Sequence, residues 1–426
     1  MKNTERIPFN KPYFTGLEVK FIEDSFKRGQ TSGNGYYTKL CQRFFEEKLS
    51  KGALAVAGKD GVLRTPKCLL TTSCTDALEM CAILSGVKNG DEVIIPSYTF
   101  VTSALAFSRE GAKIVFADSR PDNPNIDESK LEALITPRTK VIVVVHYAGV
   151  ACEMDKIMEI ARRHGIIVVE DCAQAIYSSY KDRPLGSIGD LAAFSFHETK
   201  NIQCGEGGLL VVNNEKFKND AEIVWEKGTN RSQFFRGEVD KYGWVGNGSS
   251  FLPSEYTAAF LWGQLQKVED IQRRRRELWR AYYKAFKYNP DRFANSNVSA
   301  GAEGENVLES YGIRIPALPV YAYNNAHVFY IVCRSLEQRS GLIKYLADNG
   351  IHATFHYLSL HRSKYAVQNG WDGVNLPQAD NYSNCLLRLP LYNAMQLADV
   401  EDVVSETVNY LRESEAKVAE TSPAVV

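Results

Sequence analysis

Three short stretches of the sequence carry the side chains best suited to chemistry. VVEDCAQA places Glu170 and Asp171 at the end of an aliphatic run, and FSFHETKNIQCGEGG places Lys200 just before a glycine-rich turn. TTSCTDALEM places Ser73 and Thr75 where an expected strand passes into an expected helix. One of the two acids should face a ligand, because ligands bind beyond the carboxyl ends of strands in open α/β sheets.

Together these stretches match the needs of one cofactor, pyridoxal 5′-phosphate (PLP). Its aldehyde needs a lysine with which to form an imine, and its ring nitrogen needs an acidic partner that keeps it protonated. Its phosphate needs an anion site, which the free N–H groups at a helix start provide. The residues therefore predict a PLP site that contains Lys200 and one of the two acids.

The elements expected around these stretches form a doubly wound α/β core. Short aliphatic runs alternate with helical patterns, and a glycine stands at the expected end of each helix. Strands are expected at 68–71, 92–95, 113–117, 140–146, 166–170, 192–196 and 209–212. The helices between them have the sequences TDALEMCAILSGV, TFVTSALAFSREG and EMDKIMEIARRHG.

Beyond this core the sequence predicts a linking helix and a smaller domain. We expect a large α/β domain with an N-terminal arm over 1–252, a link over 253–296 made mainly of one helix from 253 to 286, and a small α+β domain over 297–426. The small domain should contain strands at 327–333 and near 351–355, a helix after Ser335, and a last helix near 399–411 followed by a frayed tail. Segments 50–66 and 228–250 are expected to be loops, and a loop as long as the second usually has a function.

The composition is that of an ordinary globular protein. Of 426 residues, 44% are hydrophobic and 24% charged, and 50 Lys and Arg against 51 Asp and Glu leave a net charge of −1. We expect neither nucleic acid nor membrane as a partner, and no apolar stretch predicts a signal peptide or a membrane span, so a cytoplasmic location is expected. The 9 cysteines form no CxxC pair and the 7 histidines show no ligand spacing, so no metal site is expected.

The longer motifs resemble the DegT/DnrJ/StrS family of nucleotide-sugar aminotransferases. The resemblance runs from IPFNKP to the last helix, through PSYTFV, GAKIVFAD, VHYAGVACEMD, FSFHETKN and EKGTNRSQFFRGEVDKYGW. It implies the aspartate-aminotransferase-like fold of PLP enzymes (fold type I), with a large, mainly parallel sheet and a smaller α+β domain. It also implies a homodimer in which segment 228–250 reaches the active site of the other subunit.

The resemblance implies a role for each matching residue. Lys200 forms the imine and moves a proton during the transfer, and Asp171 pairs with the ring nitrogen. The other implied cofactor contacts are Thr75, the backbone of Asp76 and Ser195 at the phosphate, Gln174 at the 3′-oxygen, Phe100 on the ring face, and Ser250 toward the partner's phosphate.

Substrate contacts are expected from cations on or beside the long glycine-rich loop, where they would neutralise a nucleotide diphosphate. These cations are Lys227, Arg231, Arg236 and Lys241. His327 and His356 are expected to hydrogen-bond locally or to line the substrate cleft. The run Arg273–Arg276 spreads around a helix, so it is expected to be solvated or paired.

Four features depart from the family pattern. Asp76 stands where a small residue is usual, so its carboxylate must turn away from a phosphate. Ser250 stands where Asn is common, which shortens or removes the contact with the partner's phosphate. Ser359 stands where Pro is common, and segment 50–66 is an insertion.

The resemblance implies amino transfer from glutamate to TDP-4-keto-6-deoxyglucose, giving TDP-4-amino-4,6-dideoxygalactose and 2-oxoglutarate, in surface-polysaccharide biosynthesis. The same residues would serve amination at C3 or a gluco-configured product. PLP-dependent sugar dehydratases are an alternative, although those relatives carry His where this chain has Lys200. A non-catalytic PLP-binding regulator would need a DNA-binding helix-turn-helix domain, for which the residues before the first core strand show no pattern.

Overall fold

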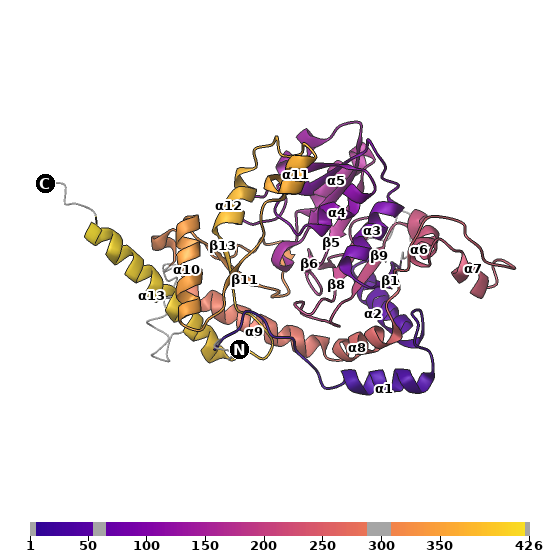
Figure 1. The fold of residues 1–426 in the computed structure, drawn as a ribbon, viewed down its shortest axis with the longest axis horizontal. Coiled ribbons are helices and arrows are strands. Elements are labelled where there is room, and N and C mark those ends of the chain that lie inside the picture. The colour runs from indigo at the N-terminus through magenta and orange to yellow at the C-terminus, as the bar shows by residue number, and fades with distance from the viewer. Residues whose placement is uncertain (1–5, 54–64, 288–307, 422–426) are drawn as a thin grey trace.

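A seven-stranded sheet forms the centre of the computed structural model, which describes residues 6–53, 65–287 and 308–421 (Figure 1). The strand order is β1-β9-β8-β5-β4-β2-β3. Strands β8, β5, β4, β2 and β3 run parallel, and β9 runs antiparallel to both β8 and β1. The bounds are β1 Lys67–Thr71, β2 Glu92–Pro96, β3 Lys113–Ala117, β4 Thr139–Val145, β5 Ile167–Asp171, β8 Leu191–Ser195 and β9 Gly208–Val212. All seven expected strands are present, and no end is shifted by more than one residue.

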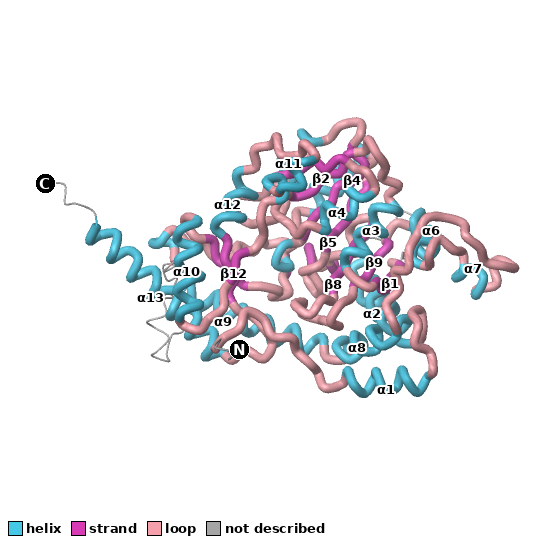
Figure 2. The backbone as a smooth tube through the Cα atoms, in the orientation of Figure 1, coloured by secondary structure: helices cyan, strands magenta, loops and turns pink. Residues whose placement is uncertain are grey.

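Apolar side chains from the two faces of the sheet enter two separate cores. On β5, Val169 packs in the core that includes α3 (Cys74–Leu84), and Val168 packs in the core that includes α5 (Met154–His164). Successive side chains of a strand point to opposite faces, so Glu170 and Asp171 face different cores. The tube drawing shows the strands surrounded by helices, which include α4 (Thr102–Arg109) and α6 (Lys218–Trp225) (Figure 2).

The expected long helix over 253–286 is two helices, α8 (Glu255–Leu265) and α9 (Val268–Lys287). They separate at Gln266 and Lys267 because they pack against different partners. Helix α8 packs against α1 (Glu18–Arg28) and α2 (Tyr36–Ala53), whereas α9 packs against α13 (Leu397–Thr421). The single-helix prediction was therefore wrong.

A second, antiparallel sheet follows α9 in the chain, with strand order β11-β13-β12. Its strands are β11 Phe329–Val332, β12 Thr354–Phe355 and β13 Leu386–Leu389, with helices α10 Leu336–Asp348, α11 Lys364–Gln368 and α12 Pro377–Cys385 around them. A small third sheet joins β6 Ser179–Tyr180 to β7 Arg183–Pro184 and β10 Ala322–Tyr323. None of the described helices is both long and apolar enough to cross a membrane.

Two expected irregular segments are partly helical. Helix α2 continues to Ala53, so residues 50–53 are not loop, while 54–64 lie outside the described residues. Helix α13 continues to Thr421, where a frayed tail was expected from Ala416. The expected start of the small domain near residue 297 also lies outside the described residues.

Residues 228–250 form an arm that projects from the body of the molecule (Figure 1). The arm was expected to be a loop, but it includes the short helix α7 (Arg231–Phe235). Its base is closed by backbone bridges from Glu226 to Ser250 and from Thr229 to Trp244. Gly228 has a φ of 72°, and a Cβ there would lie 2.0 Å from the Gly246 carbonyl oxygen, so the closure requires glycine.

Candidate active site

Asp171 ends β5 and is buried on the face that carries α3. Its carboxylate accepts hydrogen bonds from Ser103 Oγ at 2.7 Å and from the Ala173 N–H at 3.0 Å. Burial raises the pKa of Asp171, while those two hydrogen bonds and the charge of Lys200 act in the opposite direction. No salt bridge to Asp171 occurs in the described part of the chain. A buried carboxylate of this kind suits a protonated nitrogen on a ligand.

Lys200 lies in the turn between β8 and β9, where its N–H donates to the His197 carbonyl at 2.9 Å. Burial lowers the pKa of Lys200, and the cation Arg388 lowers it further, while Cys74 and Asp171 raise it. A lower pKa increases the fraction of neutral amine, which is the form that attacks an aldehyde. The Lys200 amine is therefore suited to forming an imine with an aldehyde.

The start of α3 forms a cradle of backbone N–H groups that suits an anion such as a phosphate. Ser73 caps this helix, since its Oγ accepts the Asp76 N–H at 3.0 Å. The N–H groups of Cys74 and Thr75 belong to the first turn, which has no intrahelical partners for them. A Cβ on Gly208 of β9 would lie 2.3 Å from the Ser73 carbonyl oxygen and 2.5 Å from Cys74 N. Glycine at this position lets the turn lie directly against the sheet.

Two predicted phosphate residues border this cradle. The Asp76 carboxylate accepts a hydrogen bond from Thr72 Oγ1, so this side chain is held by its own strand-to-helix turn. Ser195 ends β8, and its Oγ accepts the His197 N–H at 3.3 Å, which leaves its hydroxyl proton free to donate. Neutral donors therefore dominate the cradle.

Gln174 and Phe100 both adjoin Tyr357. Gln174 Oε1 accepts the Ala148 N–H at 2.7 Å, and its Nε2 donates to the Tyr357 hydroxyl at 3.0 Å. The Phe100 ring is 52% exposed and its centroid lies 6.0 Å from that of Tyr357. An exposed ring beside a fixed amide can stack on a planar ligand.

The two histidines are both hydrogen-bonded within the protein and both neutral. His327 Nδ1 lies 2.9 Å from Oδ1 of Asn201, the residue after Lys200, and His356 Nδ1 lies 3.0 Å from the Tyr147 hydroxyl. Burial holds the pKa of each imidazole well below its usual value, and the charge of Lys200 adds to this effect. The structure thus shows the expected local hydrogen bonds of both histidines, while their place in a substrate cleft stays a prediction.

Arg275 supports this region from α9. It is buried and donates to the carbonyls of Ala326 at 3.1 Å, His327 at 2.6 Å and Leu391 at 3.3 Å. Arg273 and Arg274 form ion pairs with Asp270 and Glu277. The expectation that the whole arginine run is solvated or paired was therefore wrong for Arg275, because the α9 face that carries it packs against the second sheet.

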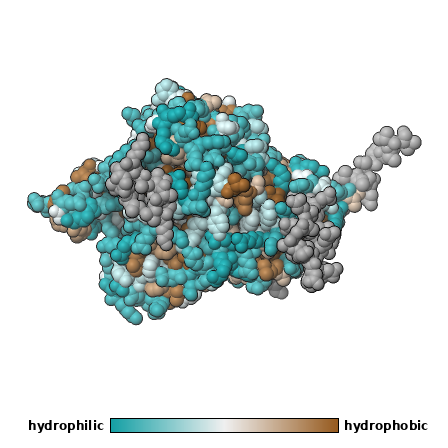
Figure 3. Space-filling model, turned by 180° about the vertical axis from the view of Figure 1, so that it is seen from behind, coloured by the Kyte–Doolittle hydropathy of each residue, from teal (hydrophilic) through white to brown (hydrophobic). Residues whose placement is uncertain are grey.

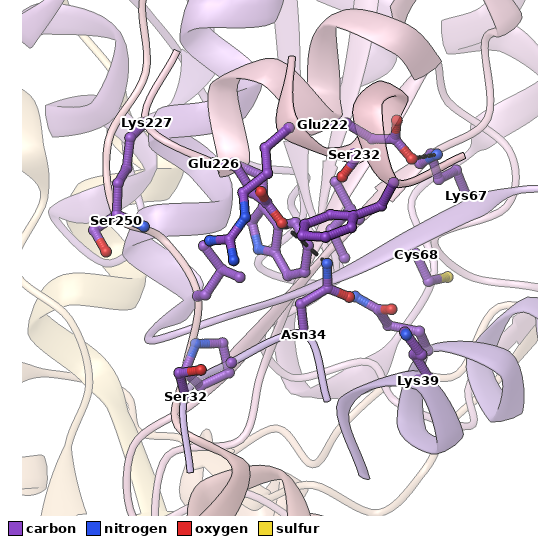
Figure 4. Close-up of a pocket in the computed structure, with 18 of the residues that line it drawn as sticks. Ser32, Asn34, Lys39, Lys67, Cys68, Glu222, Glu226, Lys227, Ser232 and Ser250 are labelled. Carbon is purple, nitrogen blue, oxygen red and sulfur yellow. Dashed lines mark hydrogen bonds and ion pairs between the residues drawn. The ribbon is translucent and has the colours of Figure 1, made fainter. Parts of the chain in front are cut away.

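Three of the four cations expected to bind a diphosphate line a cavity of about 770 Å³ that does not include Lys200 (Figure 4). Lys227, Arg231 and Arg236 line it together with Ser250, but Lys200 and Lys241 do not. Arg236 is paired with Glu222 and Glu238, and the Arg231 guanidinium lies 5.2 Å from the Phe235 ring. Figure 4 shows Lys227 and Ser250 on one side of the cavity and the Lys67–Glu222 ion pair on the other.

Glu170, the second acid of VVEDCAQA, belongs to a buried group with His146 and Cys172 on the opposite face of β5. It accepts the N–H groups of Gly186 at 2.9 Å, Ile188 at 2.8 Å and Gly189 at 2.6 Å, and lies 3.0 Å from His146 Nε2. His146 Nδ1 accepts the Cys152 N–H at 3.1 Å, so Nε2 carries the proton that bonds Glu170. These bonds use both imidazole nitrogens and give Glu170 a structural role, the anchoring of residues 186–189.

The geometry fits PLP. Lys200 offers an amine of lowered pKa for its aldehyde, Asp171 a buried carboxylate for its ring nitrogen, and the Ser73–Thr75 turn a set of N–H donors for its phosphate. The approach of this turn to Gly208 keeps those donors beside the end of β8.

The model of the DegT/DnrJ/EryC1/StrS aminotransferase family matches residues 61–408. The chain belongs to this family. This aminotransferase is 30% identical over 423 residues to the spore coat polysaccharide biosynthesis protein SpsC of Bacillus subtilis, covering 95% of this chain and 96% of SpsC.

Solved structures also resemble this aminotransferase. The putative sugar aminotransferase Spr1654 of Streptococcus pneumoniae, in its PMP form, has a TM-score of 0.81 at 25% identity, covering 97% of this chain and 99% of that one. The aminotransferase TlmJ of Streptoalloteichus hindustanus has a TM-score of 0.79 at 26% identity, covering 96% and 99%. Spr1654 has also been solved in a PLP form. The aminotransferase has the expected PLP-enzyme fold, and its cofactor is PLP.

Sequence reasoning missed two residues of the site. Ser103, which donates to Asp171, lies on α4 and has no motif of its own. Arg388 lies on β13 of the second sheet, and only the packing of that sheet brings its charge close to Lys200. The sole sequence signal for Arg388 is a charged residue within the apolar run LLRLPLY.

Proposed function

We propose that this sugar aminotransferase moves the amino group of glutamate to TDP-4-keto-6-deoxyglucose, giving TDP-4-amino-4,6-dideoxygalactose and 2-oxoglutarate. The observation that carries the proposal is the presence of Lys200, whose pKa is lowered by burial, together with the buried Asp171 in a chain that also contains FSFHETKN and EKGTNRSQFFRGEVDKYGW. The names of SpsC, in spore coat polysaccharide biosynthesis, and of Spr1654, a sugar aminotransferase, support a sugar acceptor.

PLP supplies a conjugated ring that accepts the electron pair released when a proton leaves the substrate carbon. Asp171 holds a proton on the ring nitrogen, which makes the ring a stronger acceptor. Lys200 Nζ, whose pKa is lowered by burial, takes the proton from the substrate carbon that bears nitrogen. Ser195 and the first N–H groups of α3 hold the phosphate, and Gln174 and Phe100 fix the ring's position.

A PLP-dependent sugar dehydratase is the second candidate function, but the residue at position 200 does not support it. The family resemblance implies that the relatives that remove oxygen carry His at this position, whereas this chain has Lys200. Lysine at this position favours amino transfer, because the amine both anchors the cofactor and carries the proton.

The reverse half-reaction tests the substrate. Mixing the PLP form with TDP-4-amino-4,6-dideoxygalactose should convert the cofactor to its amine form and remove its visible absorbance. A 3-amino isomer and a UDP-linked analogue should leave the spectrum unchanged. If either analogue reacts and the TDP-4-amino sugar does not, the assigned position or nucleotide is wrong, although amino transfer stands.

The active sites are proposed to be completed in a homodimer. The arm exposes hydrophobic side chains that a monomer would leave in water, including Phe235 at 69%, Tyr242 at 51% and Trp244 at 87%. Helix α1 and the residues before it expose Phe14, Val19 and Phe26 as well. Hydrophobic side chains gather on the arm and on the α1 side of the face in Figure 3. The arm also carries Arg231, Arg236 and Lys241, so docking on a second copy would deliver cations to its active site.

We predict that the double variant Phe235→Glu with Trp244→Lys is monomeric and has lost most of its activity. Both side chains are exposed within one chain, so folding should be unchanged while the partner surface is lost. Light scattering after size exclusion gives the mass, and the glutamate half-reaction gives the activity. Val367→Lys, which changes an exposed apolar residue on α11, is the matched control. A monomer with full activity would contradict shared sites.

A further inference from the structure

Asn325, on the segment between β10 and β11, is a fully buried residue that bonds the turn after β5. Its Nδ2 donates to the carbonyl oxygens of Gln174 at 2.9 Å and Ile176 at 2.8 Å, and its Oδ1 accepts the His327 N–H at 3.1 Å. These bonds use both protons of the amide. Because Gln174 is the residue expected at the 3′-oxygen of PLP, Asn325 fixes the backbone from which that side chain projects.

The backbone of Asn325 also contacts the turn that holds Lys200. Its carbonyl oxygen accepts a hydrogen bond at 2.9 Å from Nδ2 of Asn201, the residue after Lys200. This bond orients the Asn201 amide, so the Asn201 Oδ1 accepts the proton of His327 Nδ1 at 2.9 Å. Asn325 therefore bonds both turns that carry proposed cofactor residues, the one after β5 and the one after β8.

Strained backbone surrounds Asn325. Ala148, Tyr177 and Ala326 have positive φ values of 56°, 64° and 54°, a conformation that a side chain with a Cβ disfavours. Ala326 follows Asn325, and a Cβ on Gly149, the residue after Ala148, would lie 2.0 Å from Asn325 Oδ1. Strained turns persist only where other contacts hold them, and they cluster at functional sites. The contacts of Asn325 supply such a restraint.

The strained turn at Ala148 completes the support of Gln174. The Ala148 N–H donates to Gln174 Oε1 at 2.7 Å, and Gln174 Nε2 donates to the Tyr357 hydroxyl at 3.0 Å. An amide nitrogen has two protons, so Nε2 keeps one proton for a ligand oxygen. The direction of that proton is set by the turns that meet at Asn325.

In PLP the aldehyde carbon and the 3′-oxygen are attached to neighbouring ring carbons, so the groups that hold them must keep a fixed separation. We propose that Asn325 is a positioning residue that keeps Gln174 and the Lys200 turn at this separation. It acts through Gln174 and Asn201 and not on the cofactor itself. The inference rests on the proposed roles of Lys200 and Gln174, and it does not depend on which sugar is the acceptor.

The test compares Asn325→Ser and Asn201→Ala with the full-length, PLP-loaded wild type. Serine has one hydroxyl proton, so it cannot donate to both carbonyls, and Asn201→Ala removes the contact on the lysine side alone. Each variant should slow the glutamate half-reaction at saturation about 10- to 100-fold, because small displacements of reacting groups have effects of this size. The half-saturating glutamate concentration should change less than about threefold, since glutamate binding is not the step affected.

The visible absorbance of the lysine-bound cofactor gives a second readout, which a loss of stability alone would not change. The midpoint of its pH titration should shift by about 0.5 to 1 unit in Asn325→Ser, because the hydrogen bonds around the titrating group change.

Asn213→Ser is the matched control. Asn213 Nδ2 also donates to two backbone carbonyls of one turn, those of Gly186 at 3.0 Å and Gly189 at 2.9 Å. That turn is anchored by Glu170 on the opposite face of β5. The Tm should fall in both Asn213→Ser and Asn325→Ser, whereas the half-reaction rate and the absorbance should stay at wild-type values only in Asn213→Ser.

Wild-type rate and absorbance in Asn325→Ser or in Asn201→Ala would overturn the proposal. If Asn325→Ser does not fold, Asn201→Ala decides alone. Lys200→Ala is measured in parallel, and retained absorbance in that variant would mean that the proposed lysine is wrong. Loss of the absorbance in Lys200→Ala with wild-type behaviour of Asn325→Ser would overturn the positioning role alone.

Discussion

Lys200→Ala is expected to remove the visible absorbance of the lysine-bound cofactor and to reduce turnover by roughly 10⁴-fold or more, since both the anchor and the proton carrier are lost. Burial lowers the pKa of Lys200, which increases the fraction of neutral, reactive amine. Spectroscopy of the purified variant and single-turnover kinetics with glutamate provide the measurement.

Lys200→Arg and Lys181→Ala are the controls for this prediction. Arginine keeps the positive charge but cannot form an imine, so Lys200→Arg should be as inactive as Lys200→Ala. Lys181 is an exposed lysine paired with Asp155, so Lys181→Ala should retain wild-type spectrum and rate. Retained absorbance and turnover in Lys200→Ala would refute the assignment of the PLP lysine.

Asp171→Asn is expected to retain bound PLP but to slow the glutamate half-reaction by roughly 100- to 1000-fold, because an amide cannot hold the ring nitrogen in its protonated form. Asparagine has nearly the same shape, and its carbonyl can still accept the bond from Ser103 Oγ or from the Ala173 N–H. The fold should therefore persist, and single-turnover absorbance measurements report the rate.

The neighbouring acid gives a matched control. Glu170→Gln changes a buried carboxylate one residue away, but on the opposite face of β5, where it bonds His146 and three backbone N–H groups. This variant should lose about 1–3 kcal/mol of stability, measured by denaturant unfolding, while its half-reaction rate stays close to wild type. An undiminished rate in Asp171→Asn would mean that Asp171 only caps the turn after β5.

The adjacent acids Glu170 and Asp171 show that residue type alone does not decide which side chain faces the ligand site, because the position on the strand also matters. The position of the two acids at a strand end predicts that one of them contacts a ligand, and the family resemblance indicates Asp171. The structure supplies the physical reason, since the alternation of β5 directs Asp171 toward α3 and Lys200 and directs Glu170 toward His146.

Local patterns of apolar residues, caps and glycines predicted the seven core strands, the turn beyond β8 that holds Lys200, and the strand-to-helix turn at Ser73–Thr75. The break between α8 and α9 and the position of Arg388 were decided only by tertiary packing. Helix α8 packs against α1 and α2, α9 packs against α13, and the second sheet brings Arg388 close to Lys200 from nearly two hundred residues away. Such contacts join segments distant in the chain, and no local pattern records which segments will meet.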